Sequence, residues 1–462
     1  MQERDDLRKI QYQKMTGTPI PKLLLSLSIP TVITMLVTSV YNAADTAFVG
    51  SLGTSASGAV GVVFGYMAIL QATGFLFGQG CGSILARELG SKEGYEASKT
   101  ASTGFFMALF ISVIEAVLSF VFLDKLVYIL GSTETIAPYA KTYMLYILVA
   151  APLIVPSFTL NNILRYEGKA KLGAAAMMSG ALLNIGGDAL FILVFNMGIE
   201  GAGLSTALSQ LVSFCILLSS FLTKKTQTML SFKLFIEGTG KISNILLTGL
   251  PSLLRQTLGG ASSIVLNYVA KPYHDEAIAA MAIVSRVSFM VISVGLGIGQ
   301  GFQPISSFNY GAKKYRRVRE AFKTTVIAAE AVIVVLSVLV FIFSPEIIRF
   351  LRDDDNVVEI GIRALRLHSL CLVFMPPCMM GEMLLQTTGK RLQASLLSSC
   401  RSGLILVPVL LLMAWLRGLA GIQEAQPLAY IISAIPALIL IADFFKKLPK
   451  EDITEEVAEQ TS

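Results

Sequence analysis

The chain has 462 residues, of which 54% are hydrophobic and only 15% are charged. About a quarter of the residues in a soluble protein are charged, so this composition argues against a soluble globular domain. The apolar runs are continuous over about 20 residues, the length of a membrane-spanning helix, and they lack the alternation of barrel strands. The sequence therefore predicts an all-α polytopic membrane protein.

Twelve spans are predicted, at 23–48, 55–86, 98–122, 136–162, 172–195, 202–222, 243–270, 276–308, 321–343, 357–385, 391–414 and 427–445. Residues 1–22 are polar and basic and form an N-terminal segment without a cleavable signal peptide. The first lobe is expected at 23–222, an inter-lobe linker at 223–242, the second lobe at 243–445 and a tail at 446–462. From Pro449 this tail is acidic and is expected to be disordered.

Lysine and arginine are distributed unevenly between the two sides of the predicted bundle. If the N-terminus lies inside, the inner segments hold 26 of them and the outer loops hold five. This asymmetry predicts that both termini are cytoplasmic. The net charge of +6 reflects this excess of basic residues in the inner loops, which would lie beside anionic lipid. The charge therefore gives no reason to expect nucleic-acid binding.

An internal repeat is visible at a constant offset of 221 residues, at which Pro30 matches Pro251. The offset also relates Gly74, Gly78, Gln79, Gly80, Gly90, Lys92, Pro156, Gly168 and Lys169 to Gly295, Gly299, Gln300, Gly301, Gly311, Lys313, Pro377, Gly389 and Lys390. Each half has six spans, so the two halves enter the membrane in the same direction. Parallel repeats of this kind are typical of transporters.

Residues 295–301, GLGIGQG, superficially resemble a nucleotide-binding loop. They follow no strand and open no βαβ unit, which makes that interpretation weak. We expect these glycines to allow close packing between helices instead.

Four polar residues inside the spans of the first half are candidates for an ion site. Asn184 and Asp188 are four apart and share a helix face. Asp45 and Thr206 lie near the outer ends of their spans, so all four are expected at one level. Two carboxylates, an amide oxygen and a hydroxyl are hard ligands suited to Na⁺, and two nearby carboxylates can instead share a proton.

The repeat separates this cluster from a feature common to both halves. The positions related to Asp45, Asn184, Asp188 and Thr206 are apolar in the second half: Leu266, Ile405, Val409 and Pro427. The alternative interpretation, satisfied hydrogen bonds between helices, remains open. The other charges that we expect to be buried, to which the sequence assigns no role, are Glu115, Arg255, Arg286, Glu330, Glu382 and Arg401.

No catalytic motif is visible. The only histidines are His274 and His368, and the H-E-x-x-H, G-x-S-x-G and P-loop patterns do not occur. A membrane enzyme or an assembly factor is therefore disfavoured, and no organic cofactor is expected.

The chain resembles the multidrug and toxic compound extrusion (MATE) family over about residues 15–446. The resemblance is carried by Pro30, NAADTAFVGSLG at 42–53, QGCGSILARELGSKE at 79–93, NNILRYEGK at 161–169 and LLNIGGDALFI at 182–192. It implies two six-helix lobes around a V-shaped cavity. It also implies export of organic cations, as drugs or toxic metabolites, in exchange for Na⁺ or H⁺.

In that family the first-lobe cation site matches Asp45, Asn184, Asp188 and Thr206, and a proline like Pro30 lets the first helix bend. Tyr41 and Asn161 are our candidate cavity residues. Some members carry a glutamate in helix seven, where this chain has Gly259, so a second-lobe Na⁺ site is not expected. We expect a monomer in the plasma membrane. The alternative is a flippase for lipid-linked sugars in the same wider superfamily.

Overall fold

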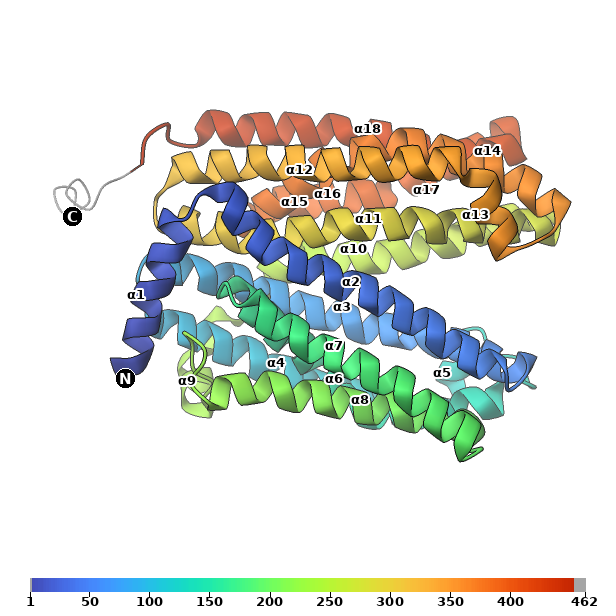
Figure 1. Ribbon diagram of the computed structural model, residues 1–462, viewed down its shortest axis with the longest axis horizontal. Helices are drawn as coiled ribbons and strands as arrows, with labels where there is room; N and C mark the ends of the chain where they lie inside the picture. The colour runs from blue at the N-terminus through green and yellow to red at the C-terminus, as the bar shows by residue number, and fades with distance from the viewer. Residues whose placement is uncertain (1, 453–462) are drawn as a thin grey trace. The chain divides into compact units, whose positions relative to one another are not determined.

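The computed structural model describes residues 2–452, apart from the side chains at 2, 3, 43 and 275. The described residues form helices and no strand (Figure 1), which confirms the all-α prediction. The segment from residue 453 onward, where most of the predicted tail falls, lies outside the described residues.

Ten helical segments of the described chain are long and apolar enough to cross a membrane. They are α2 (Ile20–Gly50), α3 (Thr54–Gly90), α4 (Gly94–Val121), α6 (Ala137–Tyr166), α7 with the π-helix η1 (Ala170–Val194), α8 (Gly198–Leu222), α11 (His274–Gly311), α12 (Tyr315–Ile342), the segment of α16, η5 and α17 (Arg391–Arg417), and α18 (Leu419–Lys447). Each coincides with a predicted span.

The other two predicted spans are also helical but differ in character. One is α10 (Ile242–Ala270), which is less apolar because it carries Arg255, Gln256 and several hydroxyl side chains. The other is broken into α14 (Asp355–Cys371), η4 (Leu372–Phe374) and α15 (Met375–Thr387). The break precedes Pro376 and Pro377, which have no backbone donor and cannot continue a helix from the preceding turn.

The chain contains short helices that the sequence analysis did not predict. Three lie in connections: α5 (Leu123–Ile129), α9 (Phe232–Glu237) and α13 (Ser344–Leu351). The N-terminal segment forms α1 (Gln2–Gly17), which runs across the direction of the long helices (Figure 1). Arg8 holds α1 in place by donating to the carbonyls of Gly94 at 2.9 Å and Gln227 at 3.2 Å.

By its internal packing the chain divides into two compact units. Unit 1 contains residues 1–15 and 33–249, and unit 2 contains residues 16–32 and 250–462. The borders fall inside α2, just after Pro30, and inside α10, just before Pro251. The start of α2 thus packs with the second half of the sequence, and the start of α10 with the first half.

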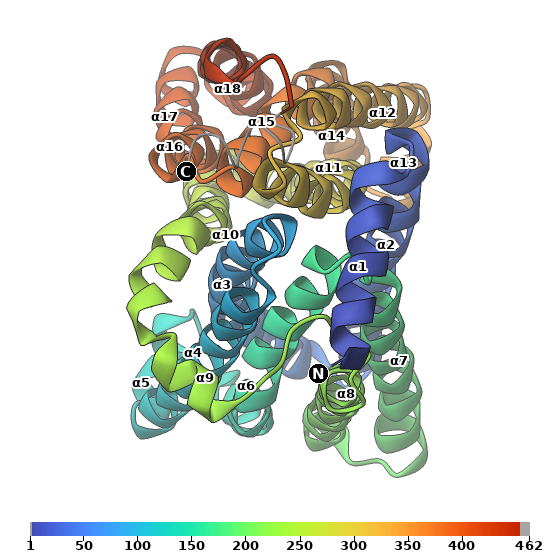
Figure 2. The same ribbon diagram turned by 90° about the vertical axis from the view of Figure 1, so that its left-hand side faces the viewer.

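Figure 2 shows the long helices of the chain roughly end-on. Glycines allow the exchanged helix starts to pack closely. In unit 1, a Cβ on Gly80 would lie 2.3 Å from the carbonyl oxygen of Ile245. In unit 2, a Cβ on Gly301, its repeat partner, would lie 2.7 Å from Cα of Ser28. Contact this close with a backbone excludes any larger residue, so the predicted packing role of the glycines in 295–301 is confirmed.

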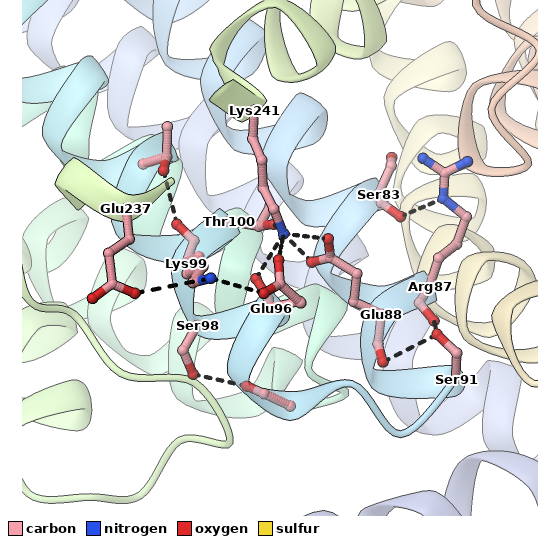
Figure 3. Close-up of polar contacts among 12 residues, drawn as sticks. Ser83, Arg87, Glu88, Ser91, Glu96, Ser98, Lys99, Thr100, Glu237 and Lys241 are labelled. Atoms are coloured by element: carbon pink, nitrogen blue, oxygen red, sulfur yellow. Dashed lines mark hydrogen bonds and ion pairs between the residues drawn. The ribbon is translucent and has the colours of Figure 1, made fainter. Parts of the chain in front are cut away.

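Lys241, at the end of the linker, joins α10 to the other helices of unit 1 (Figure 3). Its ammonium lies 2.7 Å from a carboxylate oxygen of Glu88 and 2.8 Å from one of Glu96. It also donates to the Thr100 hydroxyl at 3.1 Å. Three charge-assisted or polar contacts to one ammonium fix the position at which α10 begins.

Glu167 anchors the middle of the linker. Its buried carboxylate accepts hydrogen bonds from the backbone N–H of Gln227 at 2.8 Å and of Thr228 at 3.0 Å, and from the Thr228 hydroxyl at 2.5 Å. The linker therefore packs onto the loop between α6 and α7.

Candidate ion-coupling site

Two glycines on α7 bring this helix against α8. A Cβ on Gly180 would lie 1.9 Å from Oγ of Ser213, and one on Gly187 would lie 2.5 Å from Oγ of Ser205. The two glycines are two turns apart and share a face. Small residues at such positions let helix backbones approach in a membrane, which brings polar side chains on the two helices into contact.

The Asn184 side chain uses this contact. Its amide nitrogen donates to the Thr206 hydroxyl at 3.2 Å and to the Ser205 hydroxyl at 3.4 Å. The Ser205 hydroxyl in turn donates to the backbone carbonyl oxygen of Asn184 at 2.9 Å. These bonds orient the Asn184 amide and leave its side-chain oxygen, Oδ1, buried without a hydrogen-bond partner.

Two carboxylates complete the cluster. Asp45 on α2 is 3% exposed, and Asp188, the last residue of α7 before η1 (Ala189–Val194), is fully buried. The two carboxyl groups lie within hydrogen-bonding reach of each other. No such bond exists while both are ionised, because a carboxylate has no donor. Asp45 Oδ1 and both oxygens of Asp188 are accordingly buried and without a partner.

Tyr143 on α6 and Ser205 on α8 belong to the site, although sequence reasoning missed both. The Tyr143 hydroxyl lies 3.4 Å from the Thr206 hydroxyl, which links α6 to the cluster. Tyr41, a predicted cavity residue, lies one helical turn before Asp45 on the same side of α2. The position of Ser205 beside Thr206 was the one signal available in the sequence.

The other two predicted residues lie apart from this cluster. Asn161 on α6 packs against Gly173, near the start of α7 and three turns from Asn184. Pro30 lies in the part of α2 that belongs to unit 2. The structure therefore brings together Asp45, Asn184, Asp188 and Thr206, as well as Tyr41, but not Asn161 or Pro30.

The assembled oxygens define the chemistry that is possible here. Four buried oxygens without partners come from two carboxylates and one amide. Unpaired charges and acceptors are costly in a membrane and mark ion or substrate pathways. Carboxylate and carbonyl oxygens favour hard cations. Within residues 2–452, no cluster of three or more His, Cys, Asp or Glu side chains occurs that would suit a transition metal.

A helical membrane protein with a parallel repeat and a buried carboxylate pair has the architecture of a secondary transporter. The MatE family model matches residues 30–190 and again residues 251–412. The two matches begin at Pro30 and Pro251, which confirms the repeat offset of 221. The chain belongs to the MatE family of multidrug and toxic compound extrusion transporters.

Relatives and solved structures agree with this assignment. The multidrug export protein MepA of Staphylococcus aureus (strain MSSA476) is 25% identical over 425 residues, covering 92% of this chain and 94% of MepA. An outward-facing multidrug resistance MATE transporter matches with a TM-score of 0.90 at 25% identity, covering 95% of this chain and 98% of the other. A transporter of the MOP superfamily from Pyrococcus furiosus matches with the same score, identity and coverage.

Proposed function

We propose that this chain exports organic compounds, cations among them, from the cell in exchange for H⁺ or Na⁺. The coupling ion binds at Asp45, Asn184, Asp188 and Thr206. The observation that carries this proposal is the convergence of four buried oxygens without hydrogen-bond partners. A bound cation or proton supplies the positive charge that these oxygens lack.

The two carboxylates give the site a choice between two occupants. A sodium ion satisfies both carboxylates and the Asn184 amide oxygen together. A proton placed on one carboxylate lets that group donate a hydrogen bond to the other, so the pair can share one proton. Either occupant neutralises charge in unit 1, so ion binding and release change the energy of the buried cluster.

Alternating access by rocking of the two lobes is the transport mechanism that we propose. It is supported by the parallel repeat, which is typical of such transporters. We propose that Pro30 provides flexibility in α2, since a proline within a helix removes one backbone hydrogen bond.

We propose that the protein works as a monomer in the plasma membrane, with both termini in the cytoplasm. Cysteine labelling of intact cells tests this orientation, and access at position 313 without access at 274 would contradict it. Drug export is favoured over flipping of lipid-linked sugars because MepA, which matches over nearly its full length, is a multidrug export protein.

Dye efflux from inverted membrane vesicles tests the proposal as a whole. Vesicles with the wild-type protein should accumulate a cationic dye when a Na⁺ or a proton gradient of the correct sign is imposed. The same vesicles without a gradient, and vesicles without the protein, are the controls. Dye movement that ignores both gradients would contradict ion-coupled export.

A further inference from the structure

Unit 2 contains a buried group of three charges that the ion site does not use. Glu382 on α15 lies between two arginines: its Oε1 is 2.6 Å from Nη1 of Arg255 on α10, and its Oε2 is 3.0 Å from Nη2 of Arg401. The Glu382 side chain is 1% exposed and each arginine side chain is 9% exposed. All three lie within helices of the bundle, where charged side chains are costly and usually functional.

The three charges do not balance. In the described part of the chain, Glu382 is the only carboxylate that pairs with either arginine. The two guanidinium groups therefore share one carboxylate. Here one positive charge is in excess in a region of low dielectric, where a second anion would stabilise it.

Arg401 has a donor that no described group of the chain satisfies. Its Nη2 reaches Glu382, but its Nε is buried and has no hydrogen-bond partner. Nε and one Nη together form the fork that binds a carboxylate through two parallel hydrogen bonds. Half of this fork is thus unused.

The backbone at Arg401 is also irregular. Residues Cys400–Leu404 form the π-helix η5 between α16 (Arg391–Ser399) and α17 (Leu406–Arg417). Single π-turns within α-helices occur frequently at functional sites.

The repeat indicates that this charge group is specific to unit 2. The positions 221 residues earlier are Thr34, Asn161 and Gly180, none of which is charged. In the same way, the ion cluster of unit 1 has only apolar counterparts in the second half. A charged group that is present in one half only is more consistent with a separate task than with a shared structural role.

We propose that Arg255, Glu382 and Arg401 form a substrate-recognition site that accepts one carboxylate group of an exported compound. This proposal rests on the proposed export function. Glu382 and the substrate carboxylate compete for Arg401, and Arg255 holds Glu382 when the substrate arrives. The transporter therefore handles zwitterionic and acidic amphiphiles, in addition to simple organic cations.

Two dyes that differ in a single group test this proposal. Rhodamine B carries a free carboxylate, and its ethyl ester does not. Binding of each dye to the purified full-length protein is measured by fluorescence polarisation. Replacing Arg401 with Met should weaken binding of the free acid about tenfold, the effect of losing a charge-assisted contact, and leave the ester unchanged.

Three further variants sharpen the test. Arg363→Met is the matched control, because Arg363 pairs with Glu424 at 3.1 Å on an exposed part of unit 2. This variant should bind both dyes as the wild type does. Glu382→Gln removes the competing carboxylate and should tighten binding of the free acid alone. Arg401→Lys keeps the charge but not the forked donor geometry, so its affinity for the free acid should lie between those of Arg401→Met and the wild type. If Arg401→Met does not fold, Arg401→Lys and Glu382→Gln together still test the proposal.

An acid-to-ester affinity ratio that is the same in wild type, Glu382→Gln and the Arg401 variants would overturn the proposal. If the ester is also driven by an ion gradient in that case, the export function stands and only this inference falls. If an ion gradient drives transport of neither dye but the acid-to-ester affinity ratio depends on Arg401, the inference on carboxylate binding stands and the export function falls.

Discussion

The side-chain amide of Asn184 donates to the hydroxyl of Thr206 at 3.2 Å, which leaves the amide oxygen buried and without a partner. Thr206 thereby fixes the orientation in which Asn184 presents an acceptor beside two carboxylates. We therefore expect Thr206 both to contact the ion and to orient the Asn184 amide that also contacts it.

Thr206→Val keeps the shape of the side chain and removes the hydroxyl. We expect the Asn184 amide to lose its orientation and the coupling ion to bind about tenfold more weakly, since one buried hydrogen bond contributes roughly 1 kcal/mol or more. The ion concentration at half-maximal efflux measures this. Thr46→Val, one residue after Asp45 on an exposed face of α2, is the control and should behave as wild type.

Gly187→Ala should damage the site although glycine carries no chemistry. The new Cβ would lie 2.5 Å from Oγ and 3.2 Å from Cβ of Ser205, so the Ser205 hydroxyl must leave its place beside Asn184 or α7 and α8 must separate. We expect a loss of about 1–3 kcal/mol in stability, as for other overpacked positions, together with weaker coupling. Gly186→Ala is the matched control, because nothing lies within 4 Å of its Cβ position. Equal thermal stability of the two variants in detergent would refute the close contact.

Pro30→Ala should give a folded protein that transports more slowly. The substitution restores a backbone donor within α2 and removes the steric reason for a bend. Efflux at matched expression measures the effect. If the rate were unchanged, the flexible role of Pro30 would have to be abandoned.

The buried carboxyl of Glu167, in the loop after α6, should make the stability of the folded protein depend on pH. Burial raises the pKa of its carboxyl above the ordinary 4.5, although hydrogen bonds from Thr228 and Gln227 act in the opposite direction. Because the folded state holds the proton more tightly, the contribution of this group is greatest at acidic pH. It is lost as the pH rises through the raised pKa.

The stability of the wild type relative to Glu167→Gln should therefore decrease as the pH rises above 4.5. Thermal unfolding of both proteins across pH 4 to 8 measures the difference. A difference that stays constant with pH would show that the Glu167 carboxyl is not perturbed by its burial.

The sequence was sufficient for the long helices and for the four polar residues of the candidate ion site. Span lengths, the repeat and the four-residue spacing of Asn184 and Asp188 all follow from periodicity and composition. Tyr143 and Ser205 were missed because a sequence gives the depth of a residue along a helix but not which neighbour its face meets. Helix α1 was missed because its sequence is mostly polar and side-chain contacts from Arg8 to distant carbonyls help to hold it.

The pairing of Arg255, Glu382 and Arg401 was not predictable for a related reason. The three residues come from three separate spans, and their contacts depend on the π-helix at Cys400–Leu404 and on the rotation of each helix. Charge inside a span is visible in the sequence, whereas its partner is a property of the packing.

The central claim is that the carboxylates of Asp45 and Asp188 couple export to an ion. Asp45→Asn keeps the volume of the side chain and removes its charge, so it separates coupling from packing. Asp188→Asn should behave alike, and the double variant should be no worse than either single one, because the pair acts as one unit. Leu266→Asp in the Asp45→Asn background should not restore transport, since Ile405 and Val409 offer no oxygen ligands.

The most direct measurement is dye efflux driven by an imposed Na⁺ or proton gradient, compared with dye binding, for wild type and Asp45→Asn at matched expression. We expect that Asp45→Asn binds dye nearly as the wild type does and loses gradient-driven efflux. Efflux by Asp45→Asn with wild-type dependence on the gradient would contradict this expectation and would make Asp45 a structural residue.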